Sequence, residues 1–148
     1  MENIPKIRLS SGNDIPILGL GTWQLVGDRC TEIVKHAIEN GYNHIDTAAA
    51  YGNEDNVGKA IKETEREKLF ITSKKWFEDL SYEKIIDDCE ESLKKLGTDY
   101  LDLYLIHWPD RSQNTEEAFE AFNKILETKK IKPFGVSNFT IAHLKDSM

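Results

Sequence analysis

Four side chains capable of acid–base chemistry occur in short, distinctive stretches of this sequence. Asp46 and Tyr51 lie in I-D-T-A-A-A-Y-G-N-E, Lys74 lies in F-I-T-S-K-K-W, and His107 lies in L-I-H-W-P. A phenol, with a pKa near ~10, gives up its proton slowly at neutral pH unless a nearby cation stabilises the phenolate. Lys74 is the candidate for that cation, and the carboxylate of Asp46 would offset the burial of the ammonium.

The same four groups point to a particular reaction. Tyr51 as a general acid, with His107 donating a hydrogen bond to the same oxygen, suits the protonation of a carbonyl that is receiving hydride. No side chain can supply hydride, so a nicotinamide cofactor is implied. The predicted substrate is therefore a small aldehyde or ketone, and the predicted activity is its reduction to an alcohol.

Alternating strand-like and helix-like segments would bring these residues together. After a hairpin expected at 7–9 and 15–17, apolar runs of strand length begin near Ile17, Asn43, Leu69, Leu101 and Pro133. Segments with helical periodicity follow at 31–40, 53–62, 81–96, 115–128 and from 140 onward. This alternation predicts parallel strands whose carboxyl ends share one edge, where α/β proteins bind their ligands.

Residues at the expected helix ends fit the usual capping chemistry. Asn53, Ser81 and Thr115 are expected N-caps, because acidic residues follow each of them in the first turn. The pairs at 40–41 and 96–97 each end in glycine, which is typical of a helix C-terminus. These signals place the helix boundaries within a few residues.

Two charged stretches of the sequence allow more than one interpretation. Lys74 and Lys75 are consecutive, so strand alternation sends them to opposite faces; either could face Asp46, and we expect it to be Lys74. The run K-E-T-E-R-E-K at 62–68 is expected to be a solvated helix end and loop.

Length and composition favour one soluble domain covering residues 1–148. The chain is 39% hydrophobic and 30% charged, with a net charge of -7 that disfavours nucleic acid and anionic membrane surfaces as partners. No signal peptide is apparent, and no apolar stretch approaches the ~20 residues that cross a bilayer. The expected location is cytoplasmic, and Cys30 and Cys89 are interpreted as packing residues in a reducing compartment.

The chain resembles the aldo-keto reductases over nearly its whole length. The matching stretches, in the family's order, are L-G-L-G-T-W-Q, G-Y-N-H-I-D-T-A-A-A-Y-G-N-E, F-I-T-S-K, D-L-Y-L-I-H-W-P and G-V-S-N-F. The resemblance implies an α/β fold of the (β/α)8 TIM barrel type and carbonyl reduction with NADPH or NADH. It also implies a catalytic tetrad of Asp46, Tyr51, Lys74 and His107, with Tyr51 as the proton donor.

The resemblance further implies which residues contact the ligands. Ser137 and Asn138 would hold the nicotinamide carboxamide, and we assign Gly21, Thr22 and Asp46 to the cofactor side of the site. The residues expected around the carbonyl substrate are Trp23, Trp76, His107 and Trp108. No metal is expected.

The chain differs from the family in its length. It shows about five βα units after the amino-terminal hairpin, whereas a closed barrel needs about 250 residues. The expected fold is therefore a partial (β/α)8 barrel whose parallel sheet is left open. Loops after strands seven and eight typically bind phosphate, so affinity for NADPH or NADH should be weakened. Open edges favour self-association or pairing with another chain, unless the sequence is a fragment of a longer reading frame.

Other functions compete with carbonyl reduction. A non-catalytic half-barrel that acts as an interaction or regulatory module would keep the same residues. A metal-dependent hydrolase could use His44, Asp46 and His107, but His44 lies two residues, roughly 7 Å, deeper in its strand than Asp46. A doubly wound dinucleotide fold is disfavoured because Gln24 stands where the third glycine of its fingerprint would be.

Overall fold

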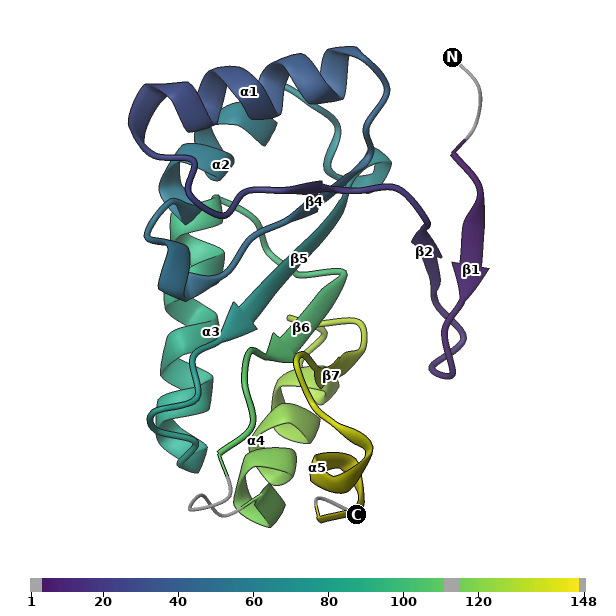
Figure 1. The fold of residues 1–148 in the computed structure, drawn as a ribbon. Helices are drawn as coiled ribbons and strands as arrows, with labels where there is room; N and C mark the ends of the chain where they lie inside the picture. Colours follow the sequence, from purple (N-terminus) through teal and green to yellow (C-terminus); the bar gives the residue numbers. More distant parts are fainter. Residues whose placement is uncertain (1–3, 111–114, 147–148) are drawn as a thin grey trace.

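The computed structural model describes residues 4–110 and 115–146 and has an α/β architecture (Figure 1). The elements run in the order β1 (Lys6–Arg8), β2 (Asp14–Pro16), β3 (Leu20–Gly21), α1 (Gly27–Glu39), β4 (His44–Asp46), η1 (Ala49–Tyr51), α2 (Glu54–Ile61), η2 (Arg66–Lys68), β5 (Phe70–Lys75), α3 (Tyr82–Leu96), β6 (Leu103–Ile106), α4 (Thr115–Glu127), β7 (Phe134–Val136) and α5 (Ile141–Asp146). The expected strand–helix alternation is confirmed.

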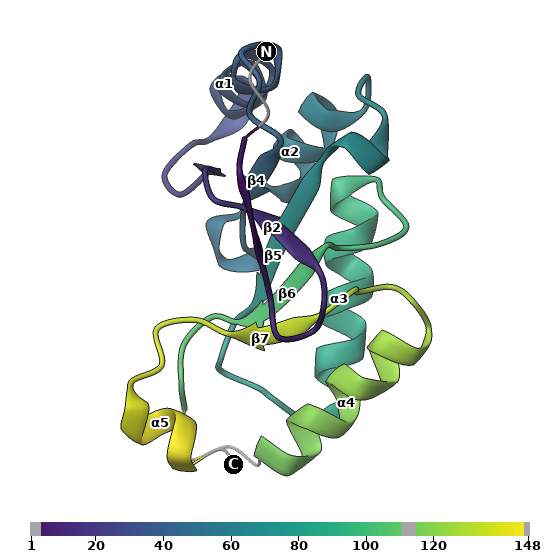
Figure 2. The same ribbon diagram turned by 90° about the vertical axis from the view of Figure 1, so that its right-hand side faces the viewer.

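A five-stranded parallel sheet forms the centre of the fold. Its order is β3-β4-β5-β6-β7, so strands adjacent in the sheet are also consecutive in the chain, each pair joined by a helical crossover. In Figure 2, helices α2, α3 and α4 lie to the right of the strands and α1 lies above them, and the four helices contact one another in chain order. Within residues 4–110 and 115–146, strands β3 and β7 are the edges and the sheet does not close on itself.

The helix-facing side of the sheet holds the hydrophobic core. In β6, Tyr104 and Ile106 are buried against the helices, whereas Leu103 and Leu105 on the opposite face are half-buried. The face of α3 expected from its periodicity is buried as well, and it consists of Ile85, Cys89, Leu93 and Leu96. The second face of the sheet is therefore only partly covered.

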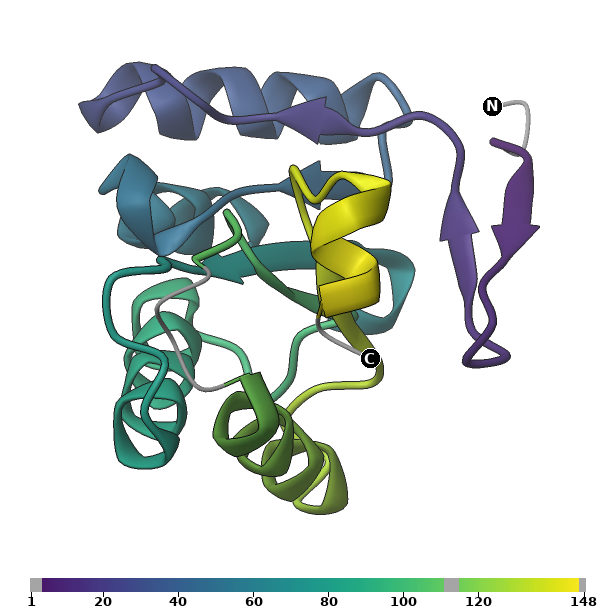
Figure 3. The ribbon, with the colours of Figure 1, turned by 60° about the horizontal axis from the view of Figure 1, so that its bottom comes forward.

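The amino-terminal hairpin lies to one side of the sheet, apart from the helices (Figure 1 and Figure 3). Strands β1 and β2 pair antiparallel with Ile7 opposite Ile15, and Gly12 has the positive φ of 85° that the tight turn requires. Residues expected to begin the next strand, Ile17 and Leu18, are exposed and outside it; β3 begins only at Leu20. The amide of Ile17 instead bonds the carbonyl of Pro5 and so extends the hairpin.

Some of the expected helix caps form in the structure and others do not. Gly97 takes the left-handed conformation at the end of α3, as expected. Asn53 and Ser81 occupy N-cap positions, but neither side chain bonds its helix. The Asn53 amide instead donates to the carbonyls of Thr22 and Leu25, at 2.8 and 2.9 Å, which ties the β3–α1 loop to the start of α2.

Two other boundaries differ from expectation. Thr115 is the first residue of α4 and not its N-cap, and α1 begins at Gly27, four residues before the expected start. Helical periodicity in this segment is weak at its exposed first turn, since Gly27, Asp28 and Arg29 all face solvent.

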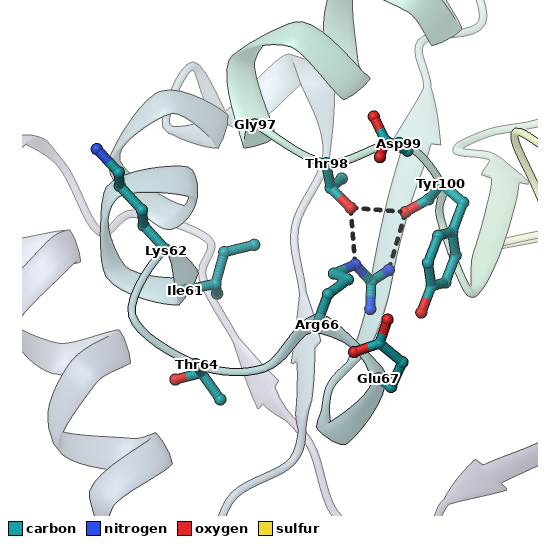
Figure 4. A pocket seen from close by; sticks show the side chains of 9 residues that line it. All are labelled: Ile61, Lys62, Thr64, Arg66, Glu67, Gly97, Thr98, Asp99 and Tyr100. Carbon is teal, nitrogen blue, oxygen red and sulfur yellow. Dashed lines mark hydrogen bonds between the residues drawn. The ribbon is translucent and has the colours of Figure 1, made fainter.

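The prediction that residues 62–68 form a solvated helix end and loop is wrong for Arg66. Its guanidinium donates to Thr98 Oγ1 at 2.7 Å, to the Leu69 carbonyl at 2.9 Å and to the Tyr100 carbonyl at 2.8 Å. It also pairs with Asp102 at 2.7 Å. Figure 4 shows Arg66 reaching from the loop before β5 to the loop before β6, along the wall of a surface pocket. This arginine fastens the amino-terminal ends of two strands together.

A buried carboxyl group lies between α2 and the sheet. Glu54 is 2% exposed, and its Oε1 accepts a hydrogen bond of 2.6 Å from Ser73 Oγ on β5. Burial raises the pKa of Glu54, and the hydrogen bond from Ser73 opposes this shift only in part.

Replacing Glu54 by glutamine should make the protein more stable at high pH. As pH rises between the unfolded and the raised folded pKa, the unfolded chain loses its proton first, so wild-type stability falls. Glutamine is uncharged at every pH and still accepts the Ser73 bond. Urea titrations should show a gain on the order of 1 kcal/mol at alkaline pH that disappears in acid. The same change at exposed Glu32 is the control, and a gain independent of pH would contradict the assignment.

Candidate active site

The carboxyl ends of the parallel strands collect the predicted residues at one edge of the sheet. Gly21 on β3 lies opposite Asp46 on β4, and Lys75 on β5 lies opposite Ile106 on β6. His107 follows β6 directly, and its amide donates to the carbonyl of Lys75 at 2.9 Å. The parallel register thus brings residues far apart in the sequence to the same end of neighbouring strands.

Lys74 lies at the centre of this cluster and is 5% exposed. Its Nζ atom is 2.5 Å from Asp46 Oδ1, 2.9 Å from the Thr47 carbonyl oxygen and 3.5 Å from Tyr51 Oη. Of the two consecutive lysines, Lys74 is thus the one that faces Asp46, as expected. A buried ammonium needs such acceptors, which explains why strand β4 ends on an aspartate.

Tyr51 is presented by the short helix η1, which follows β4. Gly52 ends this helix with a φ of 64°, a left-handed conformation that lets the chain turn directly into α2. The Lys74 ammonium lies close to the phenol oxygen and 5.1 Å from the centre of the ring. A cation in this position stabilises the phenolate and so assists the loss of the phenol proton.

His107 packs against Tyr51 and is largely buried. It is 7% exposed, and its ring meets the Tyr51 ring edge-on at a centroid distance of 5.5 Å. Burial, and next the charge of Lys74, lower the pKa of His107, with Asp46 opposing. The imidazole is therefore neutral at pH 7, with one nitrogen able to donate a hydrogen bond.

Two of the three predicted tryptophans surround His107. Trp76 meets the imidazole edge-on at 5.2 Å, and Trp108 lies nearly parallel to it at 6.5 Å with an interplanar angle of 23°. Trp23 is 68% exposed, and none of the ring contacts in the described part of the chain involves it. Trp76 and Trp108 thus form an aromatic wall beside the imidazole.

The residues expected to bind the cofactor divide into two groups. Asn138 is exposed, has a φ of 62°, and donates from Nδ2 to the His107 carbonyl at 2.9 Å and to Ser137 Oγ at 3.0 Å. Thr22 is fully buried, and its hydroxyl donates to the Asp46 carbonyl at 3.2 Å. Ser137 and Asn138 are accessible at the edge of the site, whereas Thr22 fixes the backbone below it.

A family model described as the aldo/keto reductase family matches residues 17–147. The chain belongs to the aldo/keto reductase family. A glyoxal reductase of Bacillus subtilis is 48% identical over 143 residues, which are 95% of this chain and 51% of the relative. The chain spans about half the length of the curated relatives it matches.

Solved aldo/keto reductases share the fold. The enzyme from Brucella melitensis superposes with a TM-score of 0.91 at 45% identity, covering 98% of this chain and 58% of that one. The Bombyx mori enzyme, solved in complex with NADP, gives a TM-score of 0.89 at 36% identity and covers 98% of this chain and 54% of its own. The predicted open part of a TIM barrel is therefore confirmed.

The competing metal site finds no support in this aldo/keto reductase chain. Residues 4–110 and 115–146 contain no group of three His, Cys, Asp or Glu side chains placed to hold a metal ion. His44 instead bonds Thr72 Oγ1 at 3.0 Å and packs edge-on against Phe70. Within the same residues, no helix combines the length and the apolar character needed to cross a membrane.

Three contacts of the site were not anticipated. The Thr47 carbonyl is a second acceptor for Lys74, and Asn53 holds the loop that carries Thr22. Lys75, expected only to point away, is itself buried and paired with Asp88. The stretch Y-G-N-E did mark Asn53, but as a helix cap and not as a bridge between loops.

Proposed function

We propose that this chain carries the proton-donating half of an aldo/keto reductase that reduces small aldehydes or ketones with NADPH or NADH. The observation that carries the proposal is the contact of one buried ammonium, on Lys74, with both the carboxylate of Asp46 and the phenol of Tyr51. The name of the Bacillus subtilis relative, glyoxal reductase, favours a small dicarbonyl as the substrate.

Each residue of the cluster has a separate role in the proposal. Tyr51 donates its proton to the carbonyl oxygen, and Lys74 stabilises the phenolate that remains. Asp46 keeps the lysine charged and fixed in place. His107 is neutral and donates a hydrogen bond to the same oxygen, while Trp76 and Trp108 form the wall along which the substrate lies.

The residues at the edge of the site fit the nicotinamide end of the cofactor, which would supply hydride. The hydroxyl of Ser137 and the amide of exposed Asn138 are suited to a carboxamide, which both donates and accepts hydrogen bonds. Gly21 is exposed beside Asp46 and leaves room for a ring. We place the reaction in the cytoplasm, and we expect this chain alone to bind the cofactor weakly.

The open edges of the sheet bear on how the chain associates with other chains. In the described part of the chain, strands β3 and β7 each have one unpaired side, and Ile17 and Leu18, which precede β3, are exposed apolar groups. We expect the chain to associate with itself or with a chain that supplies further βα units. Light scattering of the purified protein should give a mass above that of one chain, and a cooperative, compact monomer would contradict this expectation.

A fusion protein tests the proposed reaction. The carboxyl-terminal half of the Bacillus subtilis glyoxal reductase would be joined to this chain, and NADPH oxidation would be followed with methylglyoxal. We expect turnover in the fusion, and nicotinamide binding in a fluorescence titration. A fusion that folds and binds NADPH but reduces none of a panel of aldehydes would favour the alternative, a non-catalytic interaction or regulatory module.

A further inference from the structure

A second buried lysine lies directly beside Lys74 on the opposite face of β5. Lys75 is 2% exposed, and its Nζ atom reaches Asp88 Oδ2 on helix α3 at 2.9 Å. The same ammonium donates to the carbonyl oxygen of Trp76 at 2.7 Å. An apolar residue would fill this position without needing a counter-ion, so the charge calls for an explanation.

Two neighbouring lysines keep the carboxylate of Asp88 ionised. Burial alone would raise the pKa of Asp88, but hydrogen bonds from Lys84 and Lys75 outweigh burial and hold the pKa below its usual range. Lys84 lies one turn before Asp88 on α3, and its Nζ atom is 2.5 Å from Asp88 Oδ1. The side chain of Lys84 is 47% exposed, whereas that of Lys75 is 3% exposed. Lys75 is therefore the inner partner of the carboxylate.

The Lys75 contacts lead straight to the aromatic wall of the candidate site. Its carbonyl accepts the His107 amide at 2.9 Å, and its ammonium holds the next carbonyl, that of Trp76. Trp76 places its ring edge-on against the His107 imidazole at 5.2 Å. Both rings beside the reacting position thus depend on the conformation of the chain where β5 ends.

We propose that Lys75 and Asp88 form a positioning pair that fixes the Trp76 ring against His107 from the outer face of the sheet. Neither side chain faces the candidate substrate pocket, so the pair acts through Trp76 and is not itself catalytic. The proposal rests on the proposed function only where it assigns Trp76 to a substrate pocket. The ring contact exists without cofactor or substrate and can be tested without them.

Fluorescence of the 148-residue chain tests the pair. In a background with Trp23→Phe and Trp108→Phe, Trp76 is the only tryptophan, since the sequence has three. An imidazolium quenches a neighbouring indole more strongly than a neutral imidazole does, so emission should titrate with His107. This change should occur below the ordinary histidine pKa, because burial lowers the pKa of His107.

Four variants in that background separate positioning from general stability. Lys75→Met should lose the pH-dependent change in emission, Lys75→Arg should restore it, and Lys84→Met should keep it, because Lys84 touches Asp88 but not Trp76. Asp88→Asn should behave like Lys75→Met. Circular dichroism in urea shows which variants fold.

The outcomes are distinct. A folded Lys75→Met protein with the wild-type emission titration would overturn the proposal, as would an equal loss in Lys84→Met. If Lys75→Met does not fold, an Asp88→Asn protein that folds decides in the same way, because it breaks the same ion pair. Failure of the fusion enzyme to reduce aldehydes would leave the emission result unaffected, so the two proposals fail separately.

Discussion

Replacing Tyr51 by phenylalanine should lower the turnover number of the fusion enzyme by about 100- to 10,000-fold, the range that a general acid contributes. The substitution removes one hydroxyl, whose oxygen lies 3.5 Å from the Lys74 ammonium. The ring stays in place against His107, so the pocket keeps its shape. Affinity for NADPH, measured by nicotinamide fluorescence, should be nearly unchanged, because Tyr51 is assigned to proton transfer only.

The matched control is Tyr104→Phe. Tyr104 is fully buried on the helix-facing side of β6, away from the candidate site, and loses the same hydroxyl group. The turnover number of the Tyr104→Phe fusion should equal that of the unmodified fusion. An equal loss of turnover and cofactor affinity in Tyr51→Phe would refute the assignment of Tyr51 as proton donor, because such a result indicates a disturbed binding site.

The contact between Lys74 and Asp46 could be predicted from sequence because it depends on regular geometry. Parallel strands in register place the carboxyl end of β4 next to that of β5, whatever the loops do. Asp46 therefore had to lie near one of two lysines on the next strand. Strand alternation alone allowed either lysine to face Asp46, and the choice of Lys74 followed from the resemblance to the aldo-keto reductases, in which a hydrophobic residue is expected at the second position.

The contacts of Arg66, Lys75 and Asn53 could not be predicted in the same way. Arg66 lies in a run of charges whose composition is that of a solvated loop, and its partners Thr98 and Asp102 are more than thirty residues away. Such contacts depend on how two loops meet at the end of the sheet. No periodic pattern in the sequence indicates the contact between these two loops. From the sequence alone, the run of charges therefore favours a solvated loop.

The predicted start of the strand that became β3 was wrong for a related reason. The apolar residues Ile17 and Leu18 read as the beginning of a strand, but the chain there is still continuing the hairpin. The apolar character of a residue indicates that it favours burial, but it does not indicate which segment packs against it. In this chain both residues stay exposed beside an open edge, which fits the expected association with further βα units.

Replacing Asp102 by alanine should reduce the free energy of unfolding by about 3–5 kcal/mol, the usual loss when one partner of a buried ion pair is removed. The side chain of Asp102 is 4% exposed and pairs with Arg66 at 2.7 Å and with Lys132 at 2.6 Å. It also accepts the amide of Ile71 at 2.9 Å. Removal would leave the Arg66 guanidinium, 17% exposed, without its carboxylate.

Urea unfolding of Asp102→Ala and two further variants measures the effect. Asp102→Asn keeps an acceptor for the Ile71 amide but not the charge, so its loss should be intermediate. Glu90→Ala breaks a surface pair with Lys130, in which both side chains are more than 40% exposed, and should change stability by about 0–1 kcal/mol. An Asp102→Ala protein as stable as Glu90→Ala would show that Arg66 finds other acceptors. Because Asp102 lies before β6 and His107 after it, the folded fraction should keep its turnover number, whereas Tyr51→Phe loses turnover without losing stability.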